Sequence, residues 1–222
     1  METFFNKNSP AGVIRVTGED AEDYLQSQWT INLRKLPVRG VRYGLRLSTK
    51  GRVLADSYFL RLGEEEFLLI SKNCKGVDIL SLLQENIVAD EVEFIDETPN
   101  WEWNTLWHEE KNTYLPFTKL EKPEENKFKE VEKGFLFEDL RSFPGAFSLL
   151  LPLDSKWKPD PKWKSTEQKE VEVHRIKAGH VSIPAEIGPY ELPQEGGLEI
   201  DAVDFNKGCY LGQEVMARLH AM

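Results

Sequence analysis

The stretch VRYGLRLSTKGRVLADSYFLRL, residues 41–62, constrains the fold most strongly because it predicts a β-hairpin. Two runs with alternating apolar residues flank the turn STKG, where Gly51 can supply the positive φ of a tight turn. Further strands are predicted at 12–18, 66–71 and 90–97 by β-branched or alternating residues.

Two segments have helical rather than alternating periodicity. Residues 19–28 place apolar side chains on one face and acidic residues in the first turn, where they suit the helix dipole. Residues 73–86 place Ile79, Leu80 and Leu83 at helical spacing. Several strands interrupted by few helices predict an α+β fold with mixed or antiparallel sheets, not a repeating βαβ unit.

The middle of the chain contains one notable predicted strand, WEWNTLWH at 101–108. It places Trp101, Trp103 and Trp107 on one side of an extended chain. This side could be a stacking platform for a flat ligand such as a pterin or a base, or the buried face of a strand. We favour the buried face, because Trp side chains usually pack.

Beyond that strand, two more strands are expected around the Pro144–Gly145 turn. Charge-rich segments with proline at 119–134 and 154–170 are expected to be exposed connections.

Composition limits the classes of partner. The net charge is −10, and an acidic surface argues against direct nucleic-acid binding, since phosphate contacts need clustered Lys and Arg. The two cysteines, Cys74 and Cys209, form neither a disulfide framework nor a CxxC pair. No signal-peptide pattern and no apolar run of the ~20 residues needed to cross a bilayer are present. We expect a cytoplasmic location and no membrane partner.

Common catalytic and metal-binding motifs are absent. The sequence has no GxGxxG, GxxxxGK[ST], HExxH or GxSxG, and the scattered histidines do not predict a metal site. The remaining candidate is Cys209 in KGCYLGQE, residues 207–214. If the segment is extended, Lys207 and Cys209 share a face, and a helix that begins near Gly212 places the thiol at its positive end. Both features favour the reactive thiolate. The alternative is a buried structural cysteine, which is how we interpret Cys74.

The segment KGCYLGQEVMAR, residues 207–218, closely resembles the signature of the YgfZ proteins, which are related to the aminomethyltransferase of the glycine cleavage system, the T-protein. VTGEDAEDYLQSQWTINLRKL (16–36) and LSTKGRVLADSYFLR (47–61) resemble the N-terminal segments of that family. HRIKAGH (174–180) and ELPQEGGLE (191–199) resemble the segments that precede its signature.

The resemblance implies a folate-binding fold whose lobes surround a central cavity that holds tetrahydrofolate or a derivative. Two intertwined subdomains are expected, about 1–50 with 170–222 and about 51–169. The family's C-terminal β-barrel lobe is expected to be missing. The implied role is support of iron–sulfur cluster assembly or repair, with iron–sulfur proteins or assembly factors as partners and a link to tRNA modification through such an enzyme.

The resemblance also transfers roles to individual residues. Glu195 matches a glutamate that holds the pterin ring, and Gly196 lets a flat ligand approach the backbone. Arg175 would pair with the glutamate tail of folate or brace Glu195. Candidate catalytic residues are Cys209 and Lys207. Tyr210 and Gln213 are further candidates for the folate site, although the face of Tyr210 suits packing and Gln213 could orient the loop.

Departures from the family pattern weaken the enzyme interpretation. Ser27 and Asn32 replace a glycine and an aspartate, and Lys177 replaces a glutamate. Asp96 lacks the Gln-Gly-Pro that follows the catalytic aspartate of the transferases. An accessory protein is therefore favoured over the alternative, a folate-dependent aminomethyltransferase. A third possibility is an interaction module that has lost folate.

Overall fold

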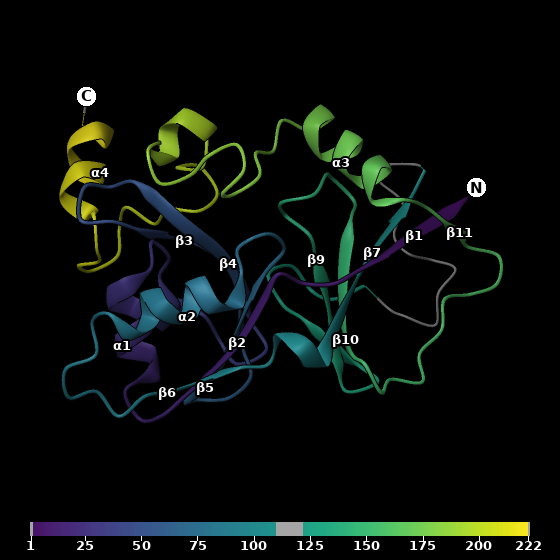
Figure 1. Cartoon of the computed structure of the whole chain (residues 1–222), viewed down its shortest axis with the longest axis horizontal. Helices are drawn as coiled ribbons and strands as arrows, with labels where there is room; N and C mark the ends of the chain where they lie inside the picture. Colours follow the sequence, from purple (N-terminus) through teal and green to yellow (C-terminus); the bar gives the residue numbers. More distant parts are fainter. Residues whose placement is uncertain (1, 110–121, 222) are drawn as a thin grey trace. The chain divides into compact units, whose positions relative to one another are not determined.

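The computed structural model describes residues 2–109 and 122–221, which form two compact units (Figure 1). Unit 1 comprises residues 1–10 and 99–181, and unit 2 comprises 11–98 and 182–222. These bounds differ from those of the two expected subdomains, about 1–50 with 170–222 and about 51–169. The reason is strand pairing: the hairpin at 41–62 joins a sheet with strands on both sides of it in sequence, so residues 51–98 stay with unit 2.

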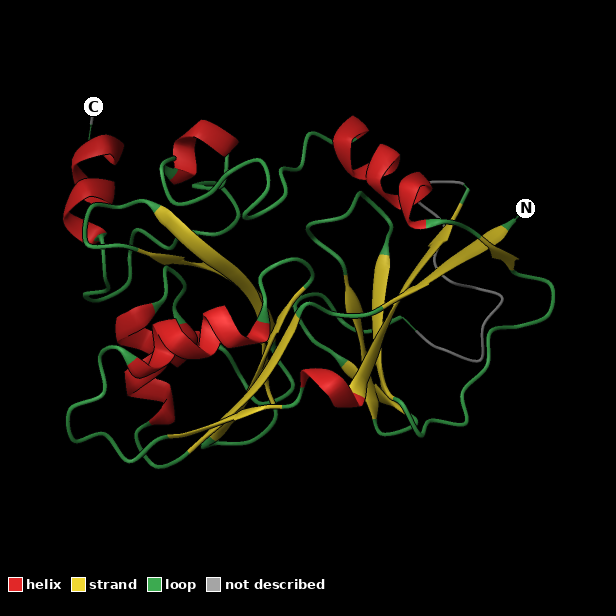
Figure 2. Cartoon of the chain, viewed as in Figure 1, coloured by secondary structure: helices red, strands yellow, loops and turns green. Residues whose placement is uncertain are grey.

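Unit 2 is built on a five-stranded sheet in the order β3-β4-β5-β2-β6 with antiparallel pairs throughout. Its strands are β2 (Gly12–Thr17), β3 (Val41–Leu47), β4 (Val53–Arg61), β5 (Glu66–Ser71) and β6 (Glu93–Asp96). The predicted hairpin is confirmed as β3 and β4, and Gly51 has a φ of 74° in their turn. The α+β prediction is also confirmed, because helices accompany one antiparallel and one mixed sheet (Figure 2).

Both predicted helices are present in unit 2, as α1 (Ala21–Gln28) and α2 (Gly76–Gln84). The Tyr24 hydroxyl of α1 donates to the Leu83 carbonyl of α2, and its ring lies 5.7 Å from that of Phe94 on β6. Each helix therefore buries its apolar side in the core of this unit. Short 3₁₀ helices follow at Leu33–Lys35 (η1), Thr98–Asn100 (η2) and Pro193–Gly196 (η3), and α4 (Gln213–His220) begins after Gly212 as expected.

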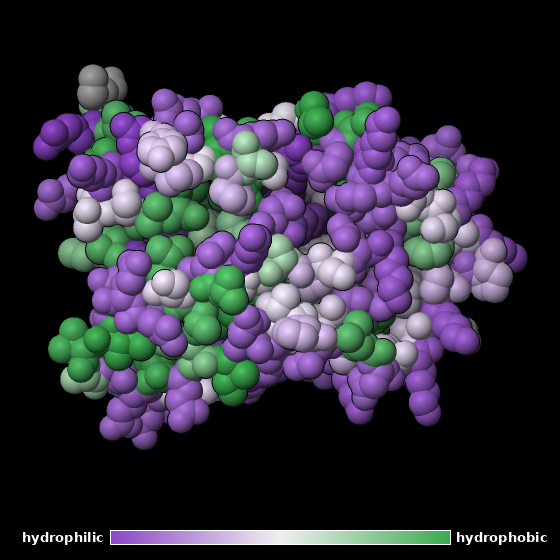
Figure 3. Space-filling model, in the orientation of Figure 1, coloured by the Kyte–Doolittle hydropathy of each residue, from purple (hydrophilic) through white to green (hydrophobic). Residues whose placement is uncertain are grey.

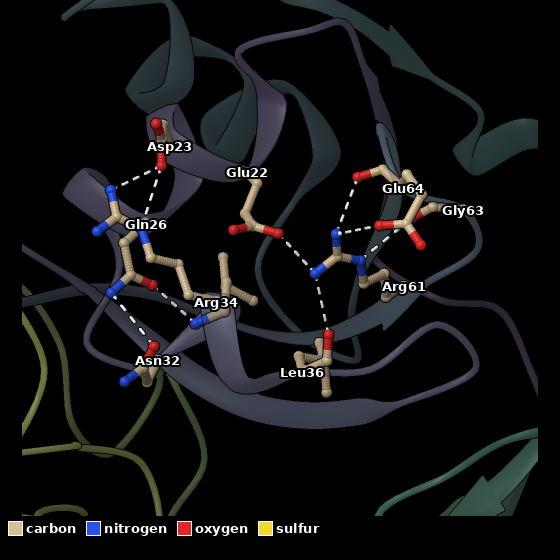
Figure 4. A network of polar contacts seen from close by, with 10 residues as sticks. Glu22, Asp23, Gln26, Asn32, Arg34, Leu36, Arg61, Gly63 and Glu64 are labelled. Carbon is tan, nitrogen blue, oxygen red and sulfur yellow. Dashed lines mark hydrogen bonds and ion pairs between the residues drawn. The ribbon is translucent and has the colours of Figure 1, made fainter.

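Polar contacts fix the chain that follows α1 (Figure 4). The buried Arg61 of β4 lies 2.6 Å from Glu22 of α1 and donates to the Leu36 carbonyl at 3.0 Å. The Gln26 side chain accepts from the N–H of Leu33 at 2.7 Å and donates to Asn32 at 3.4 Å. The segment after α1 is therefore held against the helix that precedes it.

Unit 1 is built on a six-stranded sheet in the order β11-β1-β7-β10-β9-β8. Its strands are β1 (Thr3–Asn8), β7 (Trp101–His108), β8 (Lys129–Val131), β9 (Gly134–Glu138), β10 (Phe147–Pro152) and β11 (Lys164–Ser165). The strands expected around the Pro144–Gly145 turn are confirmed as β9 and β10. The two segments expected to be connections each contain a short strand: β8 lies within 119–134 and β11 within 154–170. Residues 119–121 lie outside the described part of the chain.

Two further elements of unit 1, besides β8 and β11, were not predicted. Strand β1 pairs with β7, about a hundred residues further along the chain, and its pattern is too short to be recognised alone. Helix α3 (Gln168–Lys177) has a charged sequence, and its Val171 packs with Trp107 and Phe143. Such a helix depends on tertiary packing rather than on its own pattern.

The tryptophan face of β7 is buried, as favoured from the sequence. Trp101, Trp103 and Trp107 are 8%, 2% and 4% exposed. Their rings lie 5.6–5.9 Å from those of Phe135, Phe137 and Phe143. These rings are core residues of unit 1, so they do not form an open stacking platform. On the face shown in Figure 3, hydrophilic residues cover most of the surface and apolar residues form separate patches.

Candidate functional site

The KGCYLGQE segment lies in unit 2 as an irregular stretch that leads through a turn at 211–212 into α4, not as a strand. Lys207 is 6% exposed and Tyr210 is 8% exposed, whereas Cys209 is exposed. The expectation that Lys207 and Cys209 share a face is therefore wrong. Alternation of faces requires a regular strand, and here the buried side chains are Lys207 and Tyr210, three positions apart, with two exposed residues between them.

Lys207 binds the end of helix α1. Its Nζ donates to the backbone carbonyls of Gln26 at 2.6 Å, Ile31 at 2.7 Å and Trp29. The last carbonyls of a helix have no partner within it, and a cation there also interacts favourably with the helix dipole. Lys207 thus uses all three ammonium protons to cap the C-terminal end of α1. It is a structural contact between two segments that the sequence separates widely.

Burial opposes the charge of this ammonium group. Desolvation lowers the pKa of Lys207 to about 7, with the carboxylate of Asp204 acting in the opposite direction. The Tyr210 ring lies 5.1 Å from Nζ, and burial raises the pKa of its hydroxyl to about 12. Both side chains belong to the packed side of the loop. Tyr210 is therefore a packing residue in this structure, as its predicted face indicated.

A second buried cation lies at the same end of α1. Arg46 is 1% exposed and donates to the carbonyls of Gln28, Leu47 and Leu82 at 3.2–3.4 Å. Burial lowers the pKa of its guanidinium. The α1 terminus is therefore fixed by cations from β3 and from the KGCYLGQE loop.

The two cysteines have opposite environments. Cys209 is exposed, next to Gly208, where an added Cβ would meet no atom within 4 Å. Cys74 is 4% exposed, and its Sγ donates to Asp56 at 3.2 Å. Burial and the nearby carboxylate raise the pKa of the Cys74 thiol. Only the thiolate is a good nucleophile or metal ligand, so Cys74 is structural, as expected, and Cys209 is the accessible thiol.

The turn of the β3–β4 hairpin contacts both C-terminal motifs. An added Cβ at Gly212, which has a φ of 83°, would lie 2.7 Å from the Ser48 carbonyl oxygen. At Gly51 it would lie 3.0 Å from the side chain of Val215 in α4. The N–H of Val53 donates to the Glu191 carbonyl at 3.0 Å. The hairpin therefore brings together the segments that carry Cys209 and Glu195.

Glu195 lies in η3, where its carboxylate already has partners. One oxygen accepts the Leu192 N–H at 2.5 Å and lies 3.8 Å from the Arg52 guanidinium. The side chain is 53% exposed. This geometry caps the first turn of η3, as a glutamate three residues into a helix commonly does. Gly197, next in the chain after Gly196, has a φ of 64° and open space beside it.

The other residues that the sequence predicted as ligands, and Asp96, each have local partners. Arg175 lies in unit 1 at the end of α3 and is 7% exposed. Its Nε donates to Glu172 at 2.9 Å, and Nη1 donates to the His180 carbonyl. Gln213 is half-buried in the first turn of α4, and its N–H donates to the Tyr210 carbonyl at 3.2 Å. Asp96 accepts the Thr98 N–H at 2.9 Å.

A cavity of about 570 Å³ in unit 2 contains residues that the sequence did not single out. It lies between the segment after α1, the start of β3, the loop 199–206 and the end of α4. Its lining residues are Ile31, Asn32, Lys35, Arg42, Tyr43, Glu199, Ile200, Asp201, Val203, Asp204, Phe205, Asn206 and His220. No motif spacing joins these residues, so only the folded chain brings them together.

The described residues, 2–109 and 122–221, contain no group of three or more His, Cys, Asp or Glu side chains that could hold a metal ion. No helix among them is long and apolar enough to cross a membrane.

Comparison with known proteins shows which proteins this fold resembles. Residues 6–107 match the family model of the GCVT N-terminal domain. The crystal structure of glycine cleavage system aminomethyltransferase T from Bartonella henselae superposes with a TM-score of 0.81 over 99% of this chain and 63% of that chain, at 17% identity.

Curated proteins whose sequences align over more than nine-tenths of the chain include the following. The mitochondrial iron–sulfur cluster assembly factor IBA57 homologues of Pyricularia oryzae and Dictyostelium discoideum are each 24% identical over 93% and 94% of the chain. An uncharacterized protein of Haemophilus influenzae is 26% identical over 93% of it. The chain spans 51%, 57% and 65% of the lengths of these three relatives, in the order given.

The fold is that of the glycine cleavage T-protein, and the family model covers residues 6–107. These similarities support the resemblance to the YgfZ family that the sequence shows.

Proposed function

We propose that this chain is a tetrahydrofolate-binding accessory protein that supports iron–sulfur cluster assembly or repair, with Cys209 as its functional thiol. Two relatives that align over more than nine-tenths of the chain are named iron–sulfur cluster assembly factors. Any effect on tRNA modification would follow indirectly, through an iron–sulfur enzyme. The net charge of −10 supports a protein partner over a nucleic acid.

The observation that carries the thiol role is the position of Cys209. It is exposed on a loop whose two neighbouring buried side chains, Lys207 and Tyr210, anchor that loop to the core. An exposed thiolate can ligate iron or contact a client protein. Lys207 contributes by holding the loop, because its three protons are already donated to carbonyls of the α1 end. We therefore assign Lys207 a positioning role and not a catalytic one.

The folate half of the proposal rests on the fold and on the chemistry of the carboxylates in unit 2. A pterin ring presents an amino group and a ring N–H side by side, which a carboxylate accepts as two parallel hydrogen bonds. Glu195 has one oxygen engaged by Leu192, which leaves its other oxygen for a ligand. Gly196, Arg175 and Gln213 remain proposed contributors to a folate site.

Calorimetric titration with tetrahydrofolate under reducing conditions, together with the rate of Cys209 alkylation, tests this proposal. We expect saturable binding to the wild type and to Cys209→Ser alike, because the pterin is recognised by carboxylates. A change in alkylation rate on saturation would show that ligand and thiol lie in one site. Absence of binding would contradict the folate half and favour an interaction module.

A folate-dependent aminomethyltransferase is the second candidate function, supported by the T-protein fold alone. Asp96, the nearest match to the catalytic aspartate, holds the Thr98 N–H, and no Gln-Gly-Pro follows it. We therefore expect no release of methylene from an aminomethyl donor in the presence of tetrahydrofolate. Turnover that Asp96→Asn abolishes would establish the enzyme instead.

A further inference from the structure

The sheet of unit 2 ends in an open strand edge at β6. This strand is the last in the order β3-β4-β5-β2-β6, and among the described residues it pairs with β2 alone. The N–H of Glu97 donates to the Val13 carbonyl, which fixes the backbone groups that face β2. Because these groups alternate along an antiparallel pair, the N–H and C=O of Phe94 and Asp96 point away from β2. Such an edge can pair with a further strand.

Apolar side chains are exposed beside this edge. Ile95, on the face of β6 opposite to Phe94, is 50% exposed. In the connection from α2 to β6, Val88 is 92% exposed and Ile87 is 37% exposed. The N–H of Val88 donates to the Asp90 carboxylate at 3.3 Å, which holds Val88 near the start of β6. A strand that adds to the edge can therefore cover apolar surface as well as backbone groups.

The charge of this region is of one sign. All the charged residues of the stretch 76–97 are acidic, namely Asp78, Glu85, Asp90, Glu91, Glu93, Asp96 and Glu97. Arg15 of β2 pairs with Glu97 at 2.5 Å, whereas the side chains of Glu91 and Glu93 are exposed. A second copy of β6 would bring like charges together across the edge, which is unfavourable. A basic strand has the complementary charge.

From this edge we infer that β6 binds an extended, basic segment of a partner protein, which adds to the five-stranded sheet as a further strand. The backbone of the segment pairs with the outward groups of Phe94 and Asp96. Its Lys or Arg side chains pair with Glu91 and Glu93, and its apolar side chains contact Ile95. The inference depends on neither folate nor Cys209, so it can fail while the proposed function holds, and the reverse.

Fluorescence anisotropy with a labelled peptide of alternating lysine and valine, about seven residues long, tests the inference. We expect saturable binding to the wild type. Glu93→Lys should weaken it about fivefold or more, because a lysine of the peptide then meets a lysine of β6. Asp154→Lys, at an exposed position of unit 1, changes the net charge equally and should leave the affinity within about twofold. Equal weakening by both substitutions would overturn the inference.

Methylated peptides separate strand addition from attraction by charge alone. An added strand turns the N–H groups of alternate residues toward its neighbour. N-methylation of all the valines blocks one alternate set, and N-methylation of all the lysines blocks the other. One methylated peptide should therefore bind the wild type about tenfold more weakly than the other. Equal affinities would show that charge alone attracts the peptide and would overturn the inference.

Two further outcomes count against a basic partner. Failure of the unmethylated peptide to bind the wild type would contradict the inference directly. Analytical ultracentrifugation of the wild type and Glu93→Lys tests the other occupant, a second copy of the chain. We expect the same sedimentation for both proteins, since like charges oppose pairing of two β6 edges. A wild-type dimer that Glu93→Lys dissociates would assign the edge to self-association instead.

Discussion

The ammonium of Lys207 lies 2.6 Å from the backbone carbonyl oxygen of Gln26, in the last turn of helix α1. These residues belong to the two segments of unit 2 that most resemble the YgfZ family. Their contact explains how the loop that carries Cys209 is placed: the loop is attached to the helix end by a buried cation. The stability of unit 2 should therefore depend on Lys207 more than on any exposed lysine.

Lys207→Met should lower the free energy of unfolding by about 3 kcal/mol, because three carbonyls each lose a hydrogen bond worth roughly 1 kcal/mol. Chemical denaturation followed by tryptophan fluorescence measures this difference. Lys50→Met, at an exposed turn position, is the matched control and should change stability by less than about 0.5 kcal/mol. Equal effects of the two substitutions would contradict the capping role.

The contribution of Lys207 to stability should depend on pH. Its pKa is about 7 in the folded chain and 10.5 in the unfolded chain, so the unfolded state binds more protons between these values. Raising the pH through this window therefore favours the folded state. The stability of the wild type relative to Lys207→Met should rise by roughly 1.4 kcal/mol per pH unit from about pH 7.5 to 9. If this stability difference does not change between pH 7.5 and 9, the hydrogen bonds to the three carbonyls fully compensate the ammonium for the loss of water on burial.

Gly212→Ala should destabilise the protein by about 2 kcal/mol or more. The added Cβ would lie 2.7 Å from the Ser48 carbonyl oxygen, and a φ of 83° is strained for alanine. Gly208→Ala is the control within the same loop, since a Cβ there meets no atom within 4 Å. Thermal melts of the two variants give the comparison. A larger loss for Gly208→Ala would contradict the described contact of the hairpin turn with the start of α4.

The two thiols should differ in reactivity in the native protein. Cys209 should react with iodoacetamide within minutes at pH 8, whereas Cys74 should react only after denaturation, since it is buried and its pKa is raised. Mass spectrometry of peptides after timed alkylation separates the two sites. Rapid labelling of Cys74 in the folded protein would mean that the core around Asp56 opens readily.

Local patterns were sufficient to predict the elements of unit 2. The hairpin turn at Gly51 and the apolar face of α1 depend on residues that are near one another in sequence. Strand β1 was missed because its pairing with β7 joins residues about a hundred positions apart. The assignment of residues 51–98 to unit 2 likewise depends on strand order, which periodicity does not encode.

The site was predictable only in part. The KGCYLGQE segment identified the accessible thiol, but the shared face of Lys207 and Cys209 assumed a strand where the chain is irregular. The three carbonyls that engage Lys207 lie at or just after the end of α1, and no spacing rule connects residue 207 with residue 26. The lining of the cavity in unit 2 could not be predicted either, because its residues come from four separate segments that meet only in the folded chain.

Complementation of a strain that lacks this protein tests the proposed function most directly. The assay compares an iron–sulfur enzyme activity restored by the wild type, Cys209→Ser and Cys74→Ser, each produced to the same level as judged by immunoblot. We predict that Cys74→Ser restores most of the activity and that Cys209→Ser restores less than about a tenth, because the exposed thiol is the functional one. Full restoration by Cys209→Ser would contradict a functional role for this thiol.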